Sequence, residues 1–343
     1  MILKKIKLQN YTVFEEQAID LDRGINVFIG ENGTGKTHLL KLLYSACQAA
    51  NKKVSFPQKI VFTMLPDDYR ISRLITRKKG SNAAMVRITA SGDEMHPEKI
   101  LSMDFHHKTT KWDADVTGEA GWEEAFHDIS SIFIPAKEIL SNSFNLNAAV
   151  DKNNVRFDDT YLDIINAAKV DISDGRNNTE REAMLMEIEK IIHGRVAYDS
   201  QNDEFYIKQG NSKQEFNLVA EGIRKMALLW QLVKNGTLEK GSLLFWDEPE
   251  ANINPAYIPV IVNMLLLLQR KGVQVFVSTH DYILASYFEV YMNVNDSVLY
   301  HSFSFGTNSE NIIKYESGRK FGELGNNSII MAFDKLLDEI YDL

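Results

Sequence analysis

Hydrophobic residues follow two different periods in the first fifty residues. Residues 2–8 partly alternate between apolar and polar positions, which is typical of a strand with one buried face, and residues 15–21 predict a second strand. Residues 25–29 are apolar except for Asn26 and lie between two glycines, so we expect a strand buried on both faces. Leucines recur from residue 36 to residue 50 at helical spacing and predict a helix there.

The pattern changes after residue 50. Short β-rich segments separated by polar turns predict a mostly antiparallel region over residues 51–130, with one helical piece near 67–76. The β-rich segments are Ile60–Met64, Ala84–Ala90 and Ile100–Phe105. Residues 140–195 are then predicted to be helical, and a hairpin follows, with strands 195–198 and 204–208.

Helices and strands alternate again from residue 220 to the end. The pattern predicts helices at 220–236, 256–271, from about 281, and 327–341, with strands at 243–246, 273–278 and 298–305. Such alternation indicates an α/β fold. We therefore predict a core made of residues 1–50 and 215–343, interrupted by an inserted β-rich and helical lobe at 51–214.

Composition narrows the class of protein. The chain is 44% hydrophobic and 25% charged, which excludes a disordered or collagen-like protein, and its only cysteine, Cys47, excludes a disulfide scaffold. The formal net charge of −9 disfavours a surface devoted to nucleic acid, although a local basic groove remains compatible with it. No apolar run is long enough for a signal-peptide core or a membrane span, so we expect a soluble, cytoplasmic protein.

The strongest motif is GENGTGKT at residues 30–37, which matches G-x-x-x-x-G-K-[ST] between a buried strand and a helix. Backbone N–H groups of such a loop point at phosphates, and the helix dipole favours their negative charge. Lys36 is expected to reach the β- and γ-phosphates, and the Thr37 hydroxyl to bind Mg²⁺. The predicted nucleotide contacts are Gly30, Asn32, Gly33, Thr34, Gly35, Lys36, Thr37 and His38.

Two later strands end in polar residues. The apolar run 243–246 leads into Asp247 and Glu248; we expect Asp247 to bind Mg²⁺ and Glu248 to act as the general base that activates water. The next predicted strand leads to His280, which is expected to sense the γ-phosphate and hold the attacking water. The catalytic candidates are therefore Glu248, His280 and Lys36.

Three segments together resemble the ATP-binding-cassette clade of P-loop ATPases, in particular its RecF/SMC/OLD-like group. They are GINVFIGENGTGKTHLLK, WDEPEANINP and VSTHD. The resemblance implies an ABC-ATPase-like head with a central mixed sheet, an N-terminal antiparallel β layer and an inserted α+β lobe. It also implies ATP and Mg²⁺ as ligands, ATP hydrolysis, and a homodimer closed by ATP held between two heads.

The chain departs from this family's pattern at two switches. The signature segment, which contacts the partner's ATP in the family, corresponds here to Ala220, Glu221 and Gly222, with alanine at the serine position. The family's glutamine loop falls near Lys137 and Glu138, where there is no glutamine. For the adenine base, Tyr11 and Phe14 are the candidate stacking residues.

The resemblance also bears on partners. The segment after His280 is too short for the Toprim nuclease domain of OLD-like proteins, so we expect a separate effector protein, in anti-phage defence or DNA maintenance. A higher oligomer is compatible with this; nucleic acid is possible but not indicated, since the basic spots at 77–79, 106–108 and Lys111 are typical of a solvated surface. The alternative is a scaffold that binds ATP to assemble and does not hydrolyse it. A transporter subunit and a phosphotransferase are less compatible with these motifs.

Overall fold

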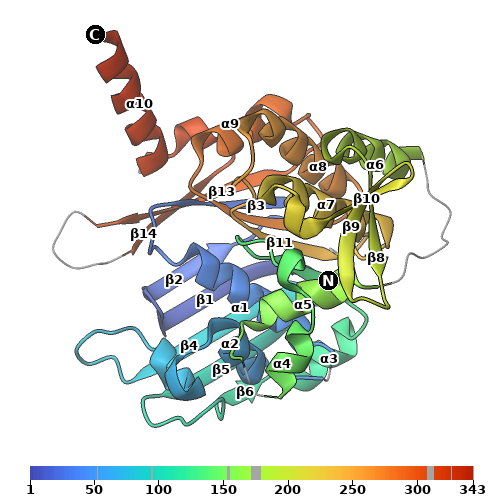
Figure 1. Cartoon of the computed structure of the whole chain (residues 1–343). Coiled ribbons are helices and arrows are strands. Elements are labelled where there is room, and N and C mark those ends of the chain that lie inside the picture. Colours follow the sequence, from blue (N-terminus) through green and yellow to red (C-terminus); the bar gives the residue numbers. More distant parts are fainter. Residues whose placement is uncertain are drawn as a thin grey trace.

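The computed structural model describes residues 1–51, 53–93, 96–152, 155–170, 179–306, 313–325 and 327–342. Its centre is a six-stranded sheet in the order β14-β13-β3-β12-β11-β7 (Figure 1). All neighbours in it are parallel except β13 and β14. The strands are β3 (Ile25–Gly30), β7 (Ser131–Ile134), β11 (Leu243–Asp247), β12 (Gln274–Thr279), β13 (Val298–Phe305) and β14 (Ile313–Gly318).

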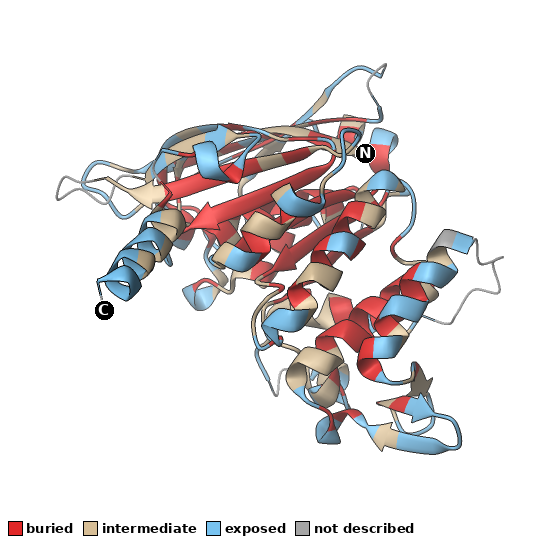
Figure 2. Ribbon diagram, turned by 90° about the horizontal axis from the view of Figure 1, so that it is seen from above, coloured by how far each residue is buried: buried red, intermediate tan, exposed pale blue. Residues whose placement is uncertain are grey.

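Both faces of the central sheet are covered, which explains its continuous apolar strands. Every residue of β3, β7, β11 and β12 is buried (Figure 2). Successive side chains point to opposite faces, so Val275 and Val277 join one hydrophobic cluster while Phe276 joins the other. The first cluster includes α7 (Glu221–Lys234), α8 (Ile258–Arg270) and α9 (Tyr282–Tyr291); the second includes α1 (Lys36–Ala49).

A five-stranded antiparallel sheet lies on the α1 side, in the order β2-β1-β4-β5-β6. Its strands are β1 (Ile2–Tyr11), β2 (Phe14–Asp20), β4 (Ala83–Ser91), β5 (Lys99–His106) and β6 (Asp115–Thr117). Alternating residues of β1 and β4 enter the second cluster, as the sequence pattern predicts for strands with one buried face. The turn between β1 and β2 lies at the edge where β3 ends, since Phe14 at the start of β2 packs against Gly35 of the loop after β3.

The remaining elements surround these two layers. The helices are α2 (Phe56–Met64), α3 (Glu119–Phe126), α4 (Leu146–Asp151), α5 (Asp159–Ala168), α6 (Thr179–Ile192) and α10 (Ser328–Tyr341). A three-stranded sheet is formed by β8 (Arg195–Asp199), β9 (Glu204–Gln209) and β10 (Ser212–Glu215). Short 3₁₀ helices occur at Asp67–Tyr69, Ile71–Leu74, Leu140–Asn142, Phe216–Leu218, Pro255–Tyr257 and Phe321–Glu323.

One local prediction is wrong. Ile60–Met64, predicted as a β-rich segment, belongs to helix α2. Ser55 caps this helix by accepting a hydrogen bond from the amide of Gln58, and Pro57 occupies its first turn, where proline is tolerated. These start signals outweigh the β propensity of the apolar residues. The predicted helical piece near 67–76 is two 3₁₀ turns.

The division of the chain into a core and a lobe at 51–214 remains a prediction about domains. Strand pairing crosses that boundary: β4 pairs with β1, and β7 pairs with β11. The predicted helical stretch at 140–195 contains α4, α5 and α6, and its residues 153–154 and 171–178 lie outside the described residues. Within the predicted lobe, β4, β5, β6 and β7 belong to the two larger sheets, whereas β8, β9 and β10 form the separate three-stranded sheet.

Candidate functional site

The phosphate-binding motif lies between the end of β3 and the start of α1, as its sequence predicts. Gly33 and Gly35 have φ angles of 85° and 92°, which L side chains rarely adopt. A Cβ atom at Gly35 would also lie 2.7 Å from the ring of Phe14. The glycines therefore permit a tight loop whose amides lead into the N-terminus of α1, with Asn32 exposed on it.

Lys36 is folded back over this loop. Its Nζ donates hydrogen bonds to the carbonyls of Gly30 (2.7 Å) and Glu31 (2.8 Å), and its side chain is buried. Burial lowers the pKa of Lys36, and the nearby carboxylates of Glu248 and Asp247 oppose this effect. The ammonium group is thus held at the loop, where negatively charged oxygens of a ligand could take the place of the two carbonyl oxygens as its hydrogen-bond acceptors.

Thr37 and Asp247 meet at the adjacent strand end. The Thr37 Oγ1 donates to the carboxylate oxygens of Asp247 at 3.0 and 3.1 Å, and Ser278, the register partner of Asp247 on β12, also donates to that carboxylate. Burial raises the pKa of Asp247, whereas the hydrogen bonds from Ser278 and Thr37 lower it. Two segments that are 210 residues apart in sequence therefore present a hydroxyl and a carboxylate to one point.

These oxygen ligands fit Mg²⁺. Mg²⁺ is usually held by one or two carboxylates, with phosphates and waters completing its octahedron. Within the described part of the chain, no group of three or more His, Cys, Asp or Glu residues is arranged to hold a metal by itself. A site made of Thr37, Asp247 and nucleotide phosphates is consistent with both observations.

Glu248 and His280 face each other across the ends of β11 and β12. His280 Nδ1 lies 3.3 Å from Glu248 Oε1, and both side chains are partly exposed. Glu248 has a φ of 46°, a strained conformation for a non-glycine residue, and its amide donates to the carbonyl of Ser278 at 2.9 Å. Strained residues cluster at functional sites. The two predicted catalytic residues are thus brought together beside the Thr37–Asp247 pair.

Glu250 is a residue of this site that the sequence analysis missed. Its buried carboxylate accepts from Thr279 Oγ1 at 2.6 Å and lies 3.4 Å from the His280 amide. Its second oxygen is buried and has no hydrogen-bond partner among the described residues. Burial raises the pKa of Glu250, and the Thr279 hydrogen bond lowers it. Its sequence signal is the third acid of the segment DEPE, after Asp247 and Glu248.

The signature residues lie at the start of α7. Ala220 is the N-cap, Glu221 and Gly222 begin the helix, and a Cβ atom at Gly222 would lie 2.6 Å from the carbonyl oxygen of Asn252. Lys225, buried on the same helix, donates to the carbonyl of Ala251 at 2.7 Å. The start of α7 is therefore packed tightly on the loop that follows Glu248.

The two glutamine-loop candidates lie after β7, and Glu138 is already engaged. Its side chain is fully buried and accepts from Arg224 Nε at 2.6 Å and from the Ser141 hydroxyl at 2.9 Å. Arg224 also donates to the carbonyls of Phe216 and Val219. Glu138 thus ties the end of β7 to α7, so it is not available as a phosphate sensor.

The proposed adenine-stacking residues are contradicted by their burial. Tyr11 and Phe14 are 0% and 2% exposed and belong to the second hydrophobic cluster. A hollow of about 830 Å³ instead opens beside Gly33 and His38, between the β1–β2 turn and residues 73–79. The Nδ1 atom of His38 is buried without a hydrogen-bond partner, and burial lowers the pKa of this imidazole. This hollow is the open space next to the phosphate loop.

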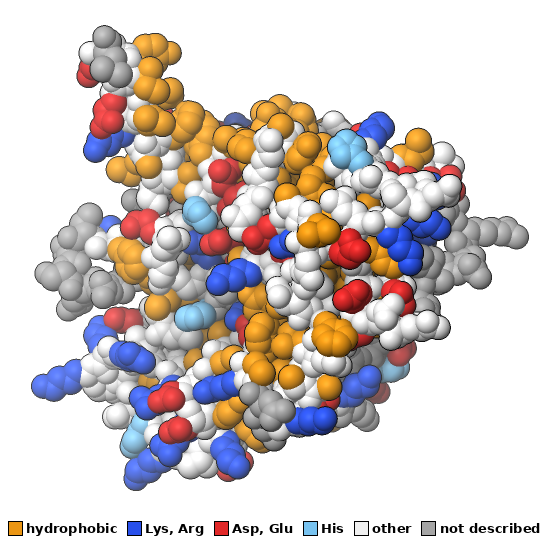
Figure 3. Space-filling model, in the orientation of Figure 1, with side chains coloured by type: hydrophobic (Ala, Val, Ile, Leu, Met, Phe, Trp, Pro, Cys, Tyr) orange, Lys and Arg blue, Asp and Glu red, His pale blue; other side chains and the backbone are white. Residues whose placement is uncertain are grey.

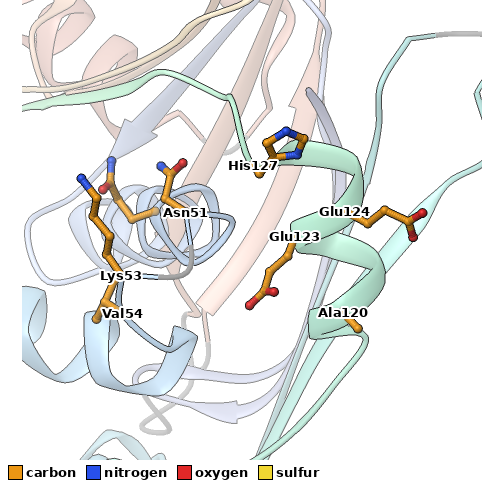
Figure 4. Close-up of a pocket in the computed structure, with 8 residues that line it drawn as sticks. Asn51, Lys53, Val54, Ala120, Glu123, Glu124 and His127 are labelled. Carbon is orange, nitrogen blue, oxygen red and sulfur yellow. The ribbon is translucent and has the colours of Figure 1, made fainter.

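A second hollow of about 830 Å³ lies at the other end of α1, against α3 (Figure 4). Its lining carries both charges, with Lys53 beside Asn51 on one side and Glu123, Glu124 and His127 from the α3 segment on the other (Figure 4). None of the predicted site residues lines it. Within the described residues, no helix combines the length and the apolar character that crossing a bilayer requires.

Comparisons with known proteins agree with this geometry. Residues 86–286, more than half of the chain, match the family described as "AAA domain, putative AbiEii toxin, Type IV TA system", and residues 1–156 match "AAA ATPase domain". The DNA replication and repair protein RecF of Limosilactobacillus fermentum is 33% identical over 92 residues, 27% of this chain and 24% of that protein. RecF of Oenococcus oeni is 25% identical over 260 residues, 70% and 69% of the two chains.

Solved structures show the same fold at low identity. The SMC head bound to the C-winged helix domain of ScpA superposes with a TM-score of 0.62 at 12% identity, covering 94% of this chain and 99% of that one. An SMC head with an extended coiled coil, bound to the C-terminal domain of ScpA from Pyrococcus furiosus, gives 0.56 at 11% identity, covering 99% of each chain. The first curated relatives are matched over only about a quarter of their length. The chain belongs to the first of these AAA-domain families, and it is similar to RecF proteins in sequence and to SMC heads in fold.

Proposed function

We propose that this protein hydrolyses ATP in a Mg²⁺-dependent manner and that two copies close around the nucleotide. The observation that carries the proposal is the contact between Thr37 and Asp247, made directly beside Lys36. A hydroxyl, a carboxylate and an ammonium group converge on the edge where β3 and β11 end. This is the set of groups that binds a nucleoside triphosphate together with its metal ion.

Each residue then has a chemical role. Lys36 exchanges the carbonyls of Gly30 and Glu31 for phosphate oxygens, and the loop amides bind the remaining phosphate charge. Glu248 accepts a proton from water as the water oxygen attacks the γ-phosphorus. The bond to the β–γ bridging oxygen breaks and ADP leaves with that electron pair. His280, 3.3 Å from Glu248, orients its carboxylate.

Thr37 and Asp247 are the residues that would hold Mg²⁺. When bound, the ion neutralises charge on the β- and γ-phosphate oxygens. Ser278 contributes by fixing the carboxylate of Asp247 through its hydrogen bond.

Steady-state turnover of ATP tests the catalytic proposal. We expect the wild type to release phosphate only with Mg²⁺, and Lys36→Ala and Thr37→Ala each to lose about 100-fold or more, the scale of removing a charge-stabilising group. Lys240→Ala, an exposed lysine outside the site, serves as the matched control and should be unchanged. Unaltered turnover in both site variants would contradict the assignment.

We further propose that the start of α7 contacts ATP on the second copy. Ala220 offers no hydroxyl, so the contact would come from the backbone amides around Gly222 at the helix N-terminus. Glu248→Gln should bind ATP without hydrolysing it and therefore accumulate the closed dimer. A closed and an open state would make conformation the output of the cycle.

The closed state is proposed to regulate a separate effector protein. The description of the matched family names a toxin, and the name of the RecF relatives cites DNA replication and repair. Both support a role in defence or DNA maintenance. A second candidate is an ATP-dependent scaffold without hydrolysis, favoured by the burial of Glu138 against Arg224, which removes one of the two glutamine-loop candidates. ATP-dependent association without turnover would select it.

A further inference from the structure

Helix α10 is amphipathic, but most apolar side chains of its C-terminal half are exposed within the part of the chain that the structure describes. Phe333 anchors the helix by stacking on Tyr282, with ring centroids 3.9 Å apart. Beyond this contact the helix stands off from the body (Figure 1), and apolar side chains lie along it in the space-filling view (Figure 3). Leu336, Ile340 and Tyr341 are 49%, 53% and 85% exposed. Contiguous exposed apolar surface of this kind marks an interaction site.

The charges of α10 define what can cover it. The helix and its C-cap carry Asp334, Asp338, Glu339 and Asp342 against a single cation, Lys335, which lies 3.7 Å from Glu339. Its complement is therefore an apolar surface with a basic margin.

The chain itself carries such a surface beside the phosphate loop. The hollow next to Gly33 has apolar walls and a basic rim, and we call it the basic hollow. Its apolar wall residues are Val13, Leu74, Ile75 and Phe305, and its rim residues are Arg73, Arg77, Lys78 and Lys79. Arg73 lies 3.4 Å from Asp67 and Lys78 is paired with Glu15, whereas Arg77 and Lys79 have no acidic partner among the described residues.

Both surfaces lie at the nucleotide edge of the molecule. The anchor of α10, Tyr282, follows His280 by two residues, and the basic hollow begins at Gly33 and His38 of the phosphate loop. No residue of α10 lines the hollow of its own chain. A face-to-face arrangement of two copies would bring the α10 of each toward the basic hollow of the other.

We propose that α10 of one copy docks on the basic hollow of the second copy. This inference rests on the dimer proposed above, and it identifies two surfaces that hold the copies together. Under two-fold symmetry it is made twice, so two helices clasp the pair. The inner end of the hollow, at Gly33 and His38, remains for the nucleotide, and the docked helix covers the outer end at Arg77 and Lys79.

Site-directed cross-linking tests this contact. One copy carries Ile340→Cys and the other Arg77→Cys, both in a Glu248→Gln background; the native Cys47 is fully buried and does not interfere. With ATP and Mg²⁺, a mixture of the two is expected to form a covalent dimer with a short bifunctional maleimide. Val294→Cys, which is 97% exposed but outside α10, is the control in place of Ile340→Cys and should give none.

Charge reversal gives an independent measurement. Arg77→Glu with Lys79→Glu should raise the dissociation constant of the ATP-bound dimer about tenfold or more, because each docked helix then meets like charges. Adding Asp334→Lys and Asp338→Lys should restore it. All four side chains are exposed, so folding is preserved, and Lys240→Glu is the matched control.

The outcomes separate this inference from the proposed function. An ATP-dependent dimer that neither cross-links at these positions nor responds to charge reversal overturns the docking of α10 and leaves the dimer standing. The exposed apolar face of α10 would then be a docking surface for a separate protein. The absence of any ATP-dependent dimer overturns the proposed dimer and the docking with it.

Discussion

At the scale of single residues, burial of the Asp247 carboxylate lowers the stability of the folded protein at a pH where the carboxylate is ionised. Burial raises its pKa, so its ionised form is disfavoured in the folded, nucleotide-free protein. The contribution of Asp247 to stability is then present at low pH and lost as the pH rises through the raised pKa. Asp247→Asn removes the charge and keeps an oxygen that accepts from Thr37 and Ser278.

We therefore expect Asp247→Asn to raise the melting temperature of the nucleotide-free protein near neutral pH. The gain should shrink as the pH falls through the raised pKa of Asp247, because the wild-type carboxyl is then also neutral. Thermal melting at several pH values measures this, and turnover of ATP should be lost in the same variant. A melting temperature that falls equally at all pH values would contradict the role of the buried charge.

Glu250 positions His280 by hydrogen bonding to the end of strand β12. Its carboxylate accepts from the Thr279 hydroxyl and lies close to the His280 amide, so it fixes the backbone that carries the imidazole. We expect Glu250→Gln to lower kcat more than it changes KM, and Glu250→Ala to lower kcat further. Steady-state kinetics of both variants, with unchanged circular dichroism, tests this positioning role; a pure rise in KM would contradict it.

At the scale of elements, α7 is fastened at two points. Gly222 allows the helix to approach the carbonyl of Asn252, since a Cβ atom there would lie 2.6 Å from that oxygen. Gly222→Ala is expected to destabilise the protein by about 1–3 kcal/mol, as overpacking does. Urea unfolding measures this, with Gly322→Ala, where a Cβ atom meets nothing within 4 Å and φ is not positive, as the matched control.

The second fastening is the pair between Glu138 and Arg224. Removing one partner leaves the other buried without its counter-charge, which costs about 3–5 kcal/mol. Glu138→Ala should therefore destabilise strongly, whereas Glu98→Ala, in the exposed pair with Lys4, should cost less than about 1 kcal/mol. Equal effects of the two substitutions in denaturant unfolding would contradict the assignment.

Local sequence signals predicted the elements that form the candidate site. The phosphate loop, the acid-ended strand β11 and His280 were found because their pattern is contained within a few neighbouring residues. The pairing of Glu138 could not be predicted, because its partner, Arg224, is 86 residues away and no local pattern reports that contact. Tyr11 and Phe14 were misjudged because their burial is set by strands that pack on them from elsewhere in the chain. Helix α2 was missed because its cap signals competed with β-branched residues.

At the scale of the whole molecule, the sheets assemble segments that the sequence analysis assigned to different domains. The alternation of β4 and β5 was visible in sequence, but the pairing of β4 with β1 was not, because register between distant strands leaves no local trace. The same limit applies to partners. The predicted cytoplasmic location and separate effector remain predictions.

The account as a whole rests on ATP-driven closure of two copies. The most direct test is the molecular mass of Glu248→Gln in solution, measured by light scattering with and without ATP and Mg²⁺, beside the same variant carrying Lys36→Ala. The account predicts a monomer without nucleotide, about twice that mass with ATP, and no change when Lys36 is also replaced. A mass that is independent of ATP in Glu248→Gln, under conditions where ATP binding is demonstrated, would contradict it.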